Sequence, residues 1–483
     1  MTSSYHNLSA TKTELLTHYL RHGRRANSSA SDIVPHRGTT EVTPIALIQE
    51  PLWWRAQTAG IPPLYNESIT IHRSGALDVI AVRESLTEIV RRHEAWRTTF
   101  RAIAGQPYQV VRPAPREFPL LIIDLRETPG ADAEWSRIAM DEVSRPFDME
   151  AGPLIRAILA SFSDREHHLL IAAHQIVVDG LSVYDVFPAE LATLYEAFVA
   201  KEPSPLPVLP AQYSDFCAWH RARIKGTIAD DELNYWGQHL ASMPPPLPWP
   251  NARQKVPLQT YRGLIHPFSL PKPLLDKLNG IRKITGVSLF AVLIAAFAAL
   301  LRLYTGHNDI IIGTPANTGR DRSEFQPLLG YFLNPVAIRV TMRENLRFVD
   351  HLLQSQNNIS DALSHSNLPL EYVAERLGLM PHRDGVQIGL SLAPSLPALR
   401  DGWSMTPMDV GSGGARWDLY LVFSEGTTGM IGRAQYNPDL FEIETIVTLI
   451  QDLTQLLEAV ADDPRLHLSE WTHTQATGIR TEA

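Results

Sequence analysis

The stretch Ala172-Ala173-His174-Gln175-Ile176-Val177-Val178-Asp179-Gly180-Leu181 marks the point where a core strand gives way to polar side chains. The apolar run from Leu169 to Ala173 leads into it and predicts a buried strand. The pair Asp179-Gly180 is typical of a turn. A helix-like pattern follows, with apolar positions at Val183, Val186, Phe187, Leu191, Leu194 and Tyr195. A His, a Gln and an Asp therefore lie on a loop between rigid elements, where catalytic groups are favoured.

Length and composition restrict the class of protein. The 483 residues suffice for two or more lobes with substantial cores. The net charge of -9, without a run of basic residues, argues against a nucleic-acid surface. The single cysteine, Cys217, predicts neither a disulfide framework nor a cysteine metal cluster, as expected for a cytoplasmic protein. Polar residues follow Met1, and the apolar run Ala291 to Leu301 is too short for a membrane span, so it predicts a buried core helix.

The first 40 residues look separate from the rest of the chain. Residues 9–22 have one apolar stripe and a Thr11 to Glu14 capping box, which predicts a short amphipathic helix. The Ser-rich, polar residues 26–40 are typical of a linker. The helix is expected either to lie on the domain as a linker helix or to act as a docking element for another synthetase protein.

The central stretch resembles the HHxxxDG motif of condensation domains from nonribosomal peptide synthetases. His174 matches the first His of the motif, and Asp179 and Gly180 match its Asp and Gly. The second His, which is the catalytic residue of the family, is replaced here by Gln175.

Other motifs of the same family follow in order. They are Pro44 to Trp53, Arg91 to Phe100, Arg145 to Asp148, Gly152 to Arg156, Tyr213 to Phe216 with Trp219, Asp309 to Pro315, Gly330 to Pro335, Asn367 to Pro369, and Arg416 to Leu419. Together the resemblance covers about residues 43–470, and an ordered series of motifs is far more specific than the His-Asp motif alone.

The resemblance implies an α/β fold of two lobes, each like chloramphenicol acetyltransferase, arranged in a V with a tunnel between them. We expect the first lobe at residues 41–215 and the second at 216–470, with elements exchanged between them and a tail at 471–483. Helical spacing predicts a helix from Leu77 to Phe100. His93 within it is expected to be structural, and His167-His168 are expected at a strand start, facing solvent.

The family joins an acyl or peptidyl thioester to an amine. Donor and acceptor arrive on the phosphopantetheine arms of two carrier proteins, so the implied partners are these carriers and other synthetase modules. The resemblance implies no bound cofactor or metal, no nucleic acid and no membrane, and a monomeric protein. The chain begins at Met1 and ends soon after the second lobe. We therefore expect an excised or free-standing domain, and a starter domain that acylates the first amino acid would fit.

The resemblance also assigns roles to individual residues. In the family, the Asp of the motif pairs with an Arg of the second lobe, and Arg320 is the best match for a structural partner of Asp179. The backbone N–H of Gly180, at the start of a helix, is a candidate oxyanion donor. The tunnel is expected to be lined near Ser182, Asn334 and Trp417, with acceptor choice depending on the last two.

Gln175 changes what the site can do. A side-chain amide can hold an amine by a hydrogen bond but does not titrate near neutral pH, and losing a positioned base typically costs about 10²–10⁴-fold in rate. His174 should face away from Gln175, because neighbours on extended backbone point to opposite sides. Three interpretations stay open. Gln175 is an engineered replacement of His, a natural residue in a domain that condenses by positioning alone, or a mark of lost chemistry.

Three functions follow from these interpretations. The leading one is an amide-forming acyltransferase of the condensation class, impaired by Gln175. The second is a non-catalytic domain that binds carriers or recruits enzymes. The third is an acyltransferase that uses a free amine acceptor, which comparison of carrier-bound with free amines would separate from the first.

Overall fold

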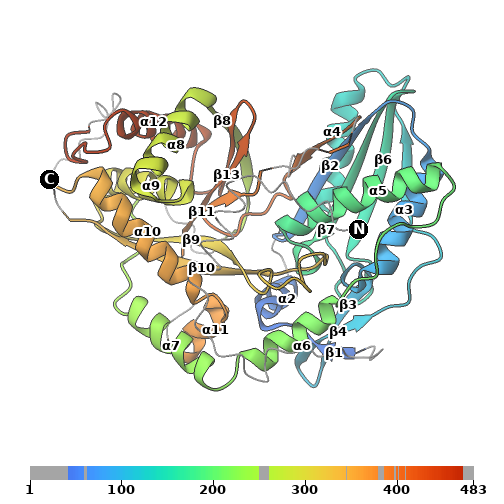
Figure 1. Ribbon diagram of the computed structural model, residues 1–483, viewed down its shortest axis with the longest axis horizontal. Coiled ribbons are helices and arrows are strands. Elements are labelled where there is room, and N and C mark those ends of the chain that lie inside the picture. The colour runs from blue at the N-terminus through green and yellow to red at the C-terminus, as the bar shows by residue number, and fades with distance from the viewer. Residues whose placement is uncertain are drawn as a thin grey trace, which may run out of the picture.

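The computed structural model describes residues 42–58, 62–249, 260–343, 345–378, 386–395, 399–400, 402–407 and 410–471. The helix expected at 9–22 and the linker at 26–40 lie outside these residues, as does the tail apart from Trp471. Within the described ranges, two units lie side by side and diverge toward the top of Figure 1, which gives the molecule the expected V shape.

The first unit is built on a mixed sheet with strand order β12-β2-β7-β6-β5. Its strands are β2 (Asn66–Ser74), β5 (Leu120–Asp124), β6 (Ile155–Ser163), β7 (Glu166–His174) and β12 (Trp403–Pro407). The predicted buried strand before His174 is thus the end of β7, a central strand flanked by β2 and β6. Strand β12 comes from far along the chain and pairs antiparallel with β2, so the second half of the chain completes the first unit's sheet.

Helices and a small sheet surround this unit. The helices are α2 (Glu50–Ala56), α3 (Val79–Arg92), α4 (Ala131–Ser144), α5 (Phe187–Val199) and α6 (Tyr213–Arg223). A further sheet in the described residues has the order β1-β4-β3, with β1 (Val42–Pro44), β3 (Thr98–Ile103) and β4 (Gln106–Val111). Apolar faces of α3 and α5 pack in one core with β2 and β7, which fixes the loop after β7 between rigid elements.

The second unit is built on a sheet of order β10-β9-β11-β13-β14-β8. Its strands are β8 (Leu264–Pro271), β9 (Asp309–Asn317), β10 (Leu333–Thr341), β11 (Ile388–Ala393), β13 (Leu419–Gly426) and β14 (Gly429–Tyr436). Its helices are α7 (Thr227–His239), α8 (Lys272–Thr285), α9 (Leu289–Thr305), α10 (Phe348–Ser364), α11 (Leu370–Arg376) and α12 (Ile443–Asp462).

The apolar run Ala291 to Leu301 lies in α9, the predicted core helix. Ser288 caps its start, because the Ala291 N–H donates to the Ser288 Oγ at 3.1 Å. Gly306 ends it with a φ of +72°, a conformation that favours glycine. Every residue from Ala291 to Leu301 is buried in the core of the second unit. Across the described ranges, no single helix is long and apolar enough to cross a bilayer, and α8 and α9 pass such a test only as a pair bent by 106°.

The helix predicted from Leu77 to Phe100 is shorter than expected. Asp78 caps its start by accepting from the N–H groups of Ile80 and Ala81, and α3 ends at Arg92. His93 is extended and buried, and its Nε2 lies 2.9 Å from Glu190 Oε2 on α5. This tertiary contact stops the helix, and the next residues form a 3-10 turn and then β3. His93 therefore has a structural place, as predicted.

His167 and His168 do lie at a strand start, but the expectation that they face solvent is wrong. His167 is buried, and its Nδ1 lies 2.9 Å from the Ser161 hydroxyl. The ring of His168 packs against the rings of Phe162 and His72, with both centroid distances at 4.3 Å. Burial lowers the pKa of His168 to about 4, so the ring is neutral near pH 7.

The change from the first core to the second occurs along α6. Phe216 and Trp219 pack in the first core, and Ile224 is in the second. The boundary that the sequence places between residues 215 and 216 falls within the same helix. Figure 1 shows α6 and α7 running along the lower side of the molecule, from one unit toward the other.

Candidate active site

The predicted loop begins where β7 ends. After His174, residues Gln175–Val177 form a single 3-10 turn, and the helix that leads into α5 starts at Gly180. The Gln175 N–H donates to the Tyr65 carbonyl at 2.7 Å, which continues the pairing of β7 with β2 for one more residue. The loop is therefore anchored at its first residue by the neighbouring strand.

His174 faces into the protein. Its side chain is buried, and its Nδ1 accepts a hydrogen bond from the Ile176 N–H at 3.2 Å. Burial lowers the pKa of His174 to about 3, so the imidazole is neutral near pH 7. His174 is absent from the lining of the cavity described below, whereas Gln175 is part of it. This agrees with the prediction that the two neighbours point to opposite sides.

Asp179 is buried at the border of the cavity and organises the turn. Its Oδ1 accepts from the backbone N–H and the hydroxyl of Ser182, both at 2.7 Å. The Val183 N–H donates to the Asp179 carbonyl at 3.1 Å. Asp179 is thus the N-cap of the helix, and Gly180 is its first residue. The N–H groups of a first helical turn have no acceptor within the helix, and Gly180 lines the cavity.

Arg320 pairs with Asp179, as the resemblance implies. Its Nη2 lies 2.9 Å from Asp179 Oδ1, and its Nε lies 3.4 Å from Oδ2. Its Nη1 donates to the carbonyls of Phe325, Gln326 and Leu328 at 2.7 to 3.1 Å. One guanidinium therefore ties the turn after β7 to the segment that leads into β10.

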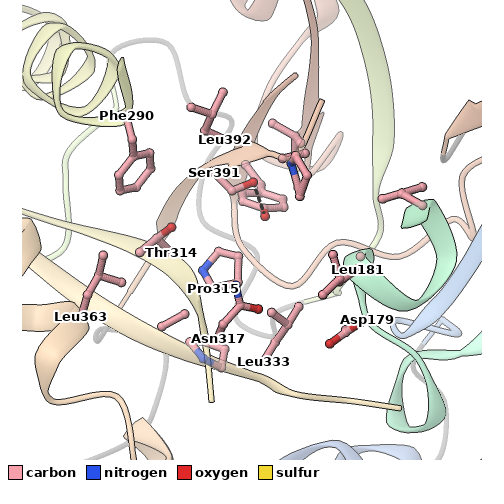
Figure 2. Close-up of a pocket in the computed structure, with 18 of the residues that line it drawn as sticks. Asp179, Leu181, Phe290, Thr314, Pro315, Asn317, Leu333, Leu363, Ser391 and Leu392 are labelled. Carbon is pink, nitrogen blue, oxygen red and sulfur yellow. Dashed lines mark hydrogen bonds between the residues drawn. The ribbon is translucent and has the colours of Figure 1, made fainter. Parts of the chain in front are cut away.

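A cavity of about 2270 Å³ lies between the two units. From the first unit it is lined by Gln175, Gly180 and Leu181, and from the second by strands β9, β11, β13 and β14 and by the loop before β13. Figure 2 shows Leu181 and Asp179 on one side of the pocket and Pro315, Leu333 and Ser391 toward the other. This position between the units corresponds to the predicted tunnel.

Trp417, Asn334 and Ser182 were expected to line this space, and of the three only Trp417 is part of the cavity wall. Trp417 lines the cavity, and its ring packs on the backbone of Gly313 and Gly389, where added Cβ atoms would lie 2.9 Å and 2.3 Å from it. Asn334 is fully buried, and its Nδ2 donates to the carbonyls of Ser366 and Leu368.

Ser182, like Asn334, does not line the cavity as the sequence predicted. It is also fully buried, and its hydroxyl donates to Asp179 and accepts from the Gly330 N–H at 3.0 Å. Neither Asn334 nor Ser182 belongs to the cavity wall. Asn334 lies within a family motif and Ser182 follows one. The sequence could not show that backbone groups of distant segments form hydrogen bonds with both side chains.

Sequence reasoning missed Glu67, an acidic residue of the cavity wall. Glu67 on β2 lines the cavity and interacts electrostatically with Tyr420 and Arg433 of the second unit's sheet. The signal was present in the sequence, because Tyr65, Glu67, Ile69 and Ile71 share one parity of a strand. An acid in an otherwise apolar stripe is an exception that needs a reason.

No group of three or more His, Cys, Asp or Glu side chains placed to hold a metal ion occurs in the part of the chain that the structure describes.

Comparison with known proteins agrees with this architecture. The family model described as condensation domain matches residues 39–478. Chondramide synthase cmdD of Chondromyces crocatus is 34% identical over 443 residues, which cover 90% of this chain and 11% of that protein. Phosphinothricin tripeptide synthetase PhsB of Streptomyces viridochromogenes is 31% identical over 434 residues, which cover 88% of this chain and 36% of that protein.

Solved structures show the same fold. The X-domain from teicoplanin biosynthesis has a TM-score of 0.80 at 24% identity, covering 91% of this chain and 100% of that one. The first condensation domain of the calcium-dependent antibiotic synthetase, in complex with a substrate analogue, has a TM-score of 0.78 at 21% identity, covering 90% and 99%. These matches confirm the predicted fold.

The chain spans only a minor part of the length of these curated relatives. The family model, in contrast, matches most of this chain. The strand that ends at His174, the turn capped by Asp179 and the partner Arg320 all lie inside the matched region. This chain belongs to the condensation domain family.

Proposed function

We propose that this chain forms an amide between a carrier-bound acyl or peptidyl thioester and a carrier-bound amine, in the cavity beside Gln175. The main support is the cavity itself, whose wall combines Gln175, the start of a helix at Gly180, and strands of the second unit. Holding two reactants in such a space can supply about 7–11 kcal/mol of the barrier. The partners would be donor and acceptor carrier proteins with phosphopantetheine arms, and other synthetase modules, in the cytoplasm.

In this proposal the two units act as lobes, at residues 41–215 and 216–470, that meet at the reacting groups. Asp179 and Arg320 would fix the turn through their buried ion pair, and Asp179 also borders the cavity. The Gly180 N–H would stabilise the oxyanion that forms when the amine attacks the thioester carbonyl. Gln175 would hold the amine by a hydrogen bond, and because it cannot take up a proton at neutral pH, the reaction would be slower than with His at this position.

Two substitutions at Gly180 test this proposal with little disturbance of the fold. An added Cβ would meet the Tyr184 ring at 3.6 Å, an ordinary contact, so Gly180→Ala should be tolerated. Proline is favoured at the first position of a helix, and Gly180→Pro removes the N–H alone. We expect Gly180→Ala to keep amide formation and Gly180→Pro to lose about 10²–10³-fold.

The assay uses a donor carrier loaded with an acyl group and an acceptor carrier loaded with an aminoacyl group. Intact mass spectrometry of both carriers should show that the acyl mass moves from the donor to the acceptor. Equal rates for the two Gly180 variants would remove the oxyanion role. Absence of transfer by the native chain and by Gly180→Ala, with both folded, would contradict the proposed function. Replacing the acceptor carrier with the free amine distinguishes the third function.

Recruitment is the second candidate, because one observation favours it. The X-domain from teicoplanin biosynthesis, which shares this fold, has also been solved in complex with OxyB. A chain with an amide side chain at the catalytic position could likewise act as a binding domain. Stable binding of carriers or of a partner enzyme without any amide formation, both in the native chain and in Gln175→His, would favour this function.

A further inference from the structure

Glu67 and Gln175 lie on neighbouring strands next to each other. In the register of β2 and β7, Glu67 pairs with Ala173, and the Gln175 N–H donates to the Tyr65 carbonyl. Residues two apart on a strand share a face, and residues directly opposite each other point the same way. Glu67 is therefore the diagonal neighbour of Gln175, a relationship that typically spans about 7–8 Å and is within reach of long side chains. Both side chains line the same cavity.

The surroundings of Glu67 come from both units. Among the described residues, no ion pair is formed by its carboxylate, and the charge that lowers its pKa is that of Arg433 on β14. The charged and titratable groups that line the cavity around it from both units include Tyr65, Asp179, Arg416, Tyr420, Glu425 and Arg433, and His174 lies on the neighbouring strand. Of these, His174 is neutral and faces the other side of the sheet, and the Tyr420 hydroxyl donates to Ser391 at 2.7 Å.

This environment changes the acidity of Glu67. Burial raises the pKa of Glu67 to about 7, and the positive charge of Arg433 only partly opposes that rise. A carboxyl group with this pKa is present in both protonation states near neutral pH, which suits a general base. Ionising this buried carboxyl also costs stability, and the charge of Arg433 offsets that cost only in part.

We infer that Glu67 is the proton acceptor for the attacking amine, in place of the histidine that Gln175 replaces. The inference rests on the proposed function. In the step, the amine nitrogen forms a C–N bond to the thioester carbonyl carbon, and the Glu67 carboxylate takes one proton from that nitrogen. The C–S bond then breaks, and the carboxyl proton passes to the leaving thiolate of the donor arm. Glu67 returns to its ionised state, with no other reactant consumed.

The test uses single-turnover amide formation with loaded carriers, measured from pH 5.5 to 8.5. Glu67→Gln keeps the shape of the side chain and removes its titration. Glu166→Gln is the control, an exposed glutamate on the neighbouring strand β7 that lies outside the cavity. We expect the native rate to rise with an apparent pKa near 7, Glu166→Gln to match it, and Glu67→Gln to lose about 10²–10⁴-fold together with this pH dependence.

A second variant separates proton transfer from a structural role. Gln175→His restores a base at the family's position, so Gln175→His/Glu67→Gln should recover the rate and titrate with the imidazole. Failure of this rescue, or a Glu67→Gln rate equal to the native one, would overturn the inference while leaving the proposed function. Amide formation only in chains that carry Gln175→His would also overturn it. Absence of amide in every variant would instead reject the proposed function.

Discussion

Arg320 and Asp179 form a buried ion pair between residues 141 positions apart, with Nη2 and Oδ1 at 2.9 Å. The carboxylate caps the helix that starts at Gly180, and the guanidinium holds the segment before β10 through its carbonyls. The guanidinium carbon also lies 3.9 Å from the centre of the Phe332 ring. The pair thus fixes the turn beside the cavity to the second half of the chain.

Breaking this pair should lower the free energy of unfolding, and the effects of substituting its two residues should be strongly coupled. Asp179→Ala leaves the Arg320 charge buried without its partner, and such a change typically costs about 3–5 kcal/mol. Arg320→Met also destabilises, because three carbonyls lose their donor. We expect the loss in the double variant to be smaller than the sum of the single losses by about 0.5–3 kcal/mol, measured by urea unfolding.

The exposed pair Lys272 and Asp276 on α8 provides the control, because exposed pairs of this spacing couple only weakly. Strict additivity of Asp179→Ala and Arg320→Met would show that the buried pair does not act as one unit.

His220 should make stability depend on pH. It is buried on α6, its Nε2 lies 3.2 Å from the Asn367 carbonyl, and burial lowers its pKa to about 3. The unfolded chain binds a proton near pH 6.5 while the folded chain does not, so the free energy of unfolding falls as pH drops from 6.5 toward 3. His220→Gln should reduce this slope by about 1.4 kcal/mol per pH unit. Urea titrations at pH 4.5, 5.5 and 7 measure it, and an unchanged slope would refute it.

Ionisation of Glu67 should make the free energy of unfolding fall as pH rises, which is the opposite direction to the effect of His220. Its folded pKa is raised, so its contribution to stability is full below the unfolded value near 4.5 and is lost as pH rises toward 7. Glu67→Gln removes the cost of a buried charge and should raise the melting temperature at pH 8 relative to the native chain. At pH 4 the two chains should melt alike. A shift of the same size at both pH values would mean that packing, not ionisation, causes it.

Trp417 should influence the choice of acceptor. Its ring forms part of the cavity wall against Gly313 and Gly389, and Trp417→Phe removes volume while keeping an aromatic ring there. We expect the ratio of rates for a bulky to a small aminoacyl acceptor to increase. Competition between two loaded acceptor carriers measures this ratio. Asn334→Ala, a change outside the cavity, should leave the ratio alone, and an equal effect of both variants would argue against a direct contact.

Sequence patterns predicted the elements that depend on local chemistry. The apolar run before His174 is β7, and the run Ala291 to Leu301 is the buried part of α9. The pairing of Asp179 with Arg320 came from the family resemblance and is present in the structure. Patterns could not predict where distant segments meet. The helix before His93 ends early because Glu190 of α5 binds that side chain.

The cavity wall was the hardest part to predict. Asn334 and Ser182 look like exposed polar residues in the sequence, but backbone groups of Ser366 and Gly330 meet them in the core. The place of Glu67 in the cavity wall could not be predicted, because its environment depends on the register of β2 with β7 and on Arg433 of the second unit. Each of these contacts joins residues that local patterns do not connect.

The central claim is that the cavity beside Gln175 forms an amide between two loaded carriers. The most direct measurement compares the single-turnover rate of acyl transfer by the native chain with that of Gln175→His, followed by intact mass of both carriers. We expect transfer by both chains, faster with His at position 175 because an imidazole accepts protons near neutral pH. If neither chain transfers the acyl group, while both are folded and bind both carriers, the claim is contradicted.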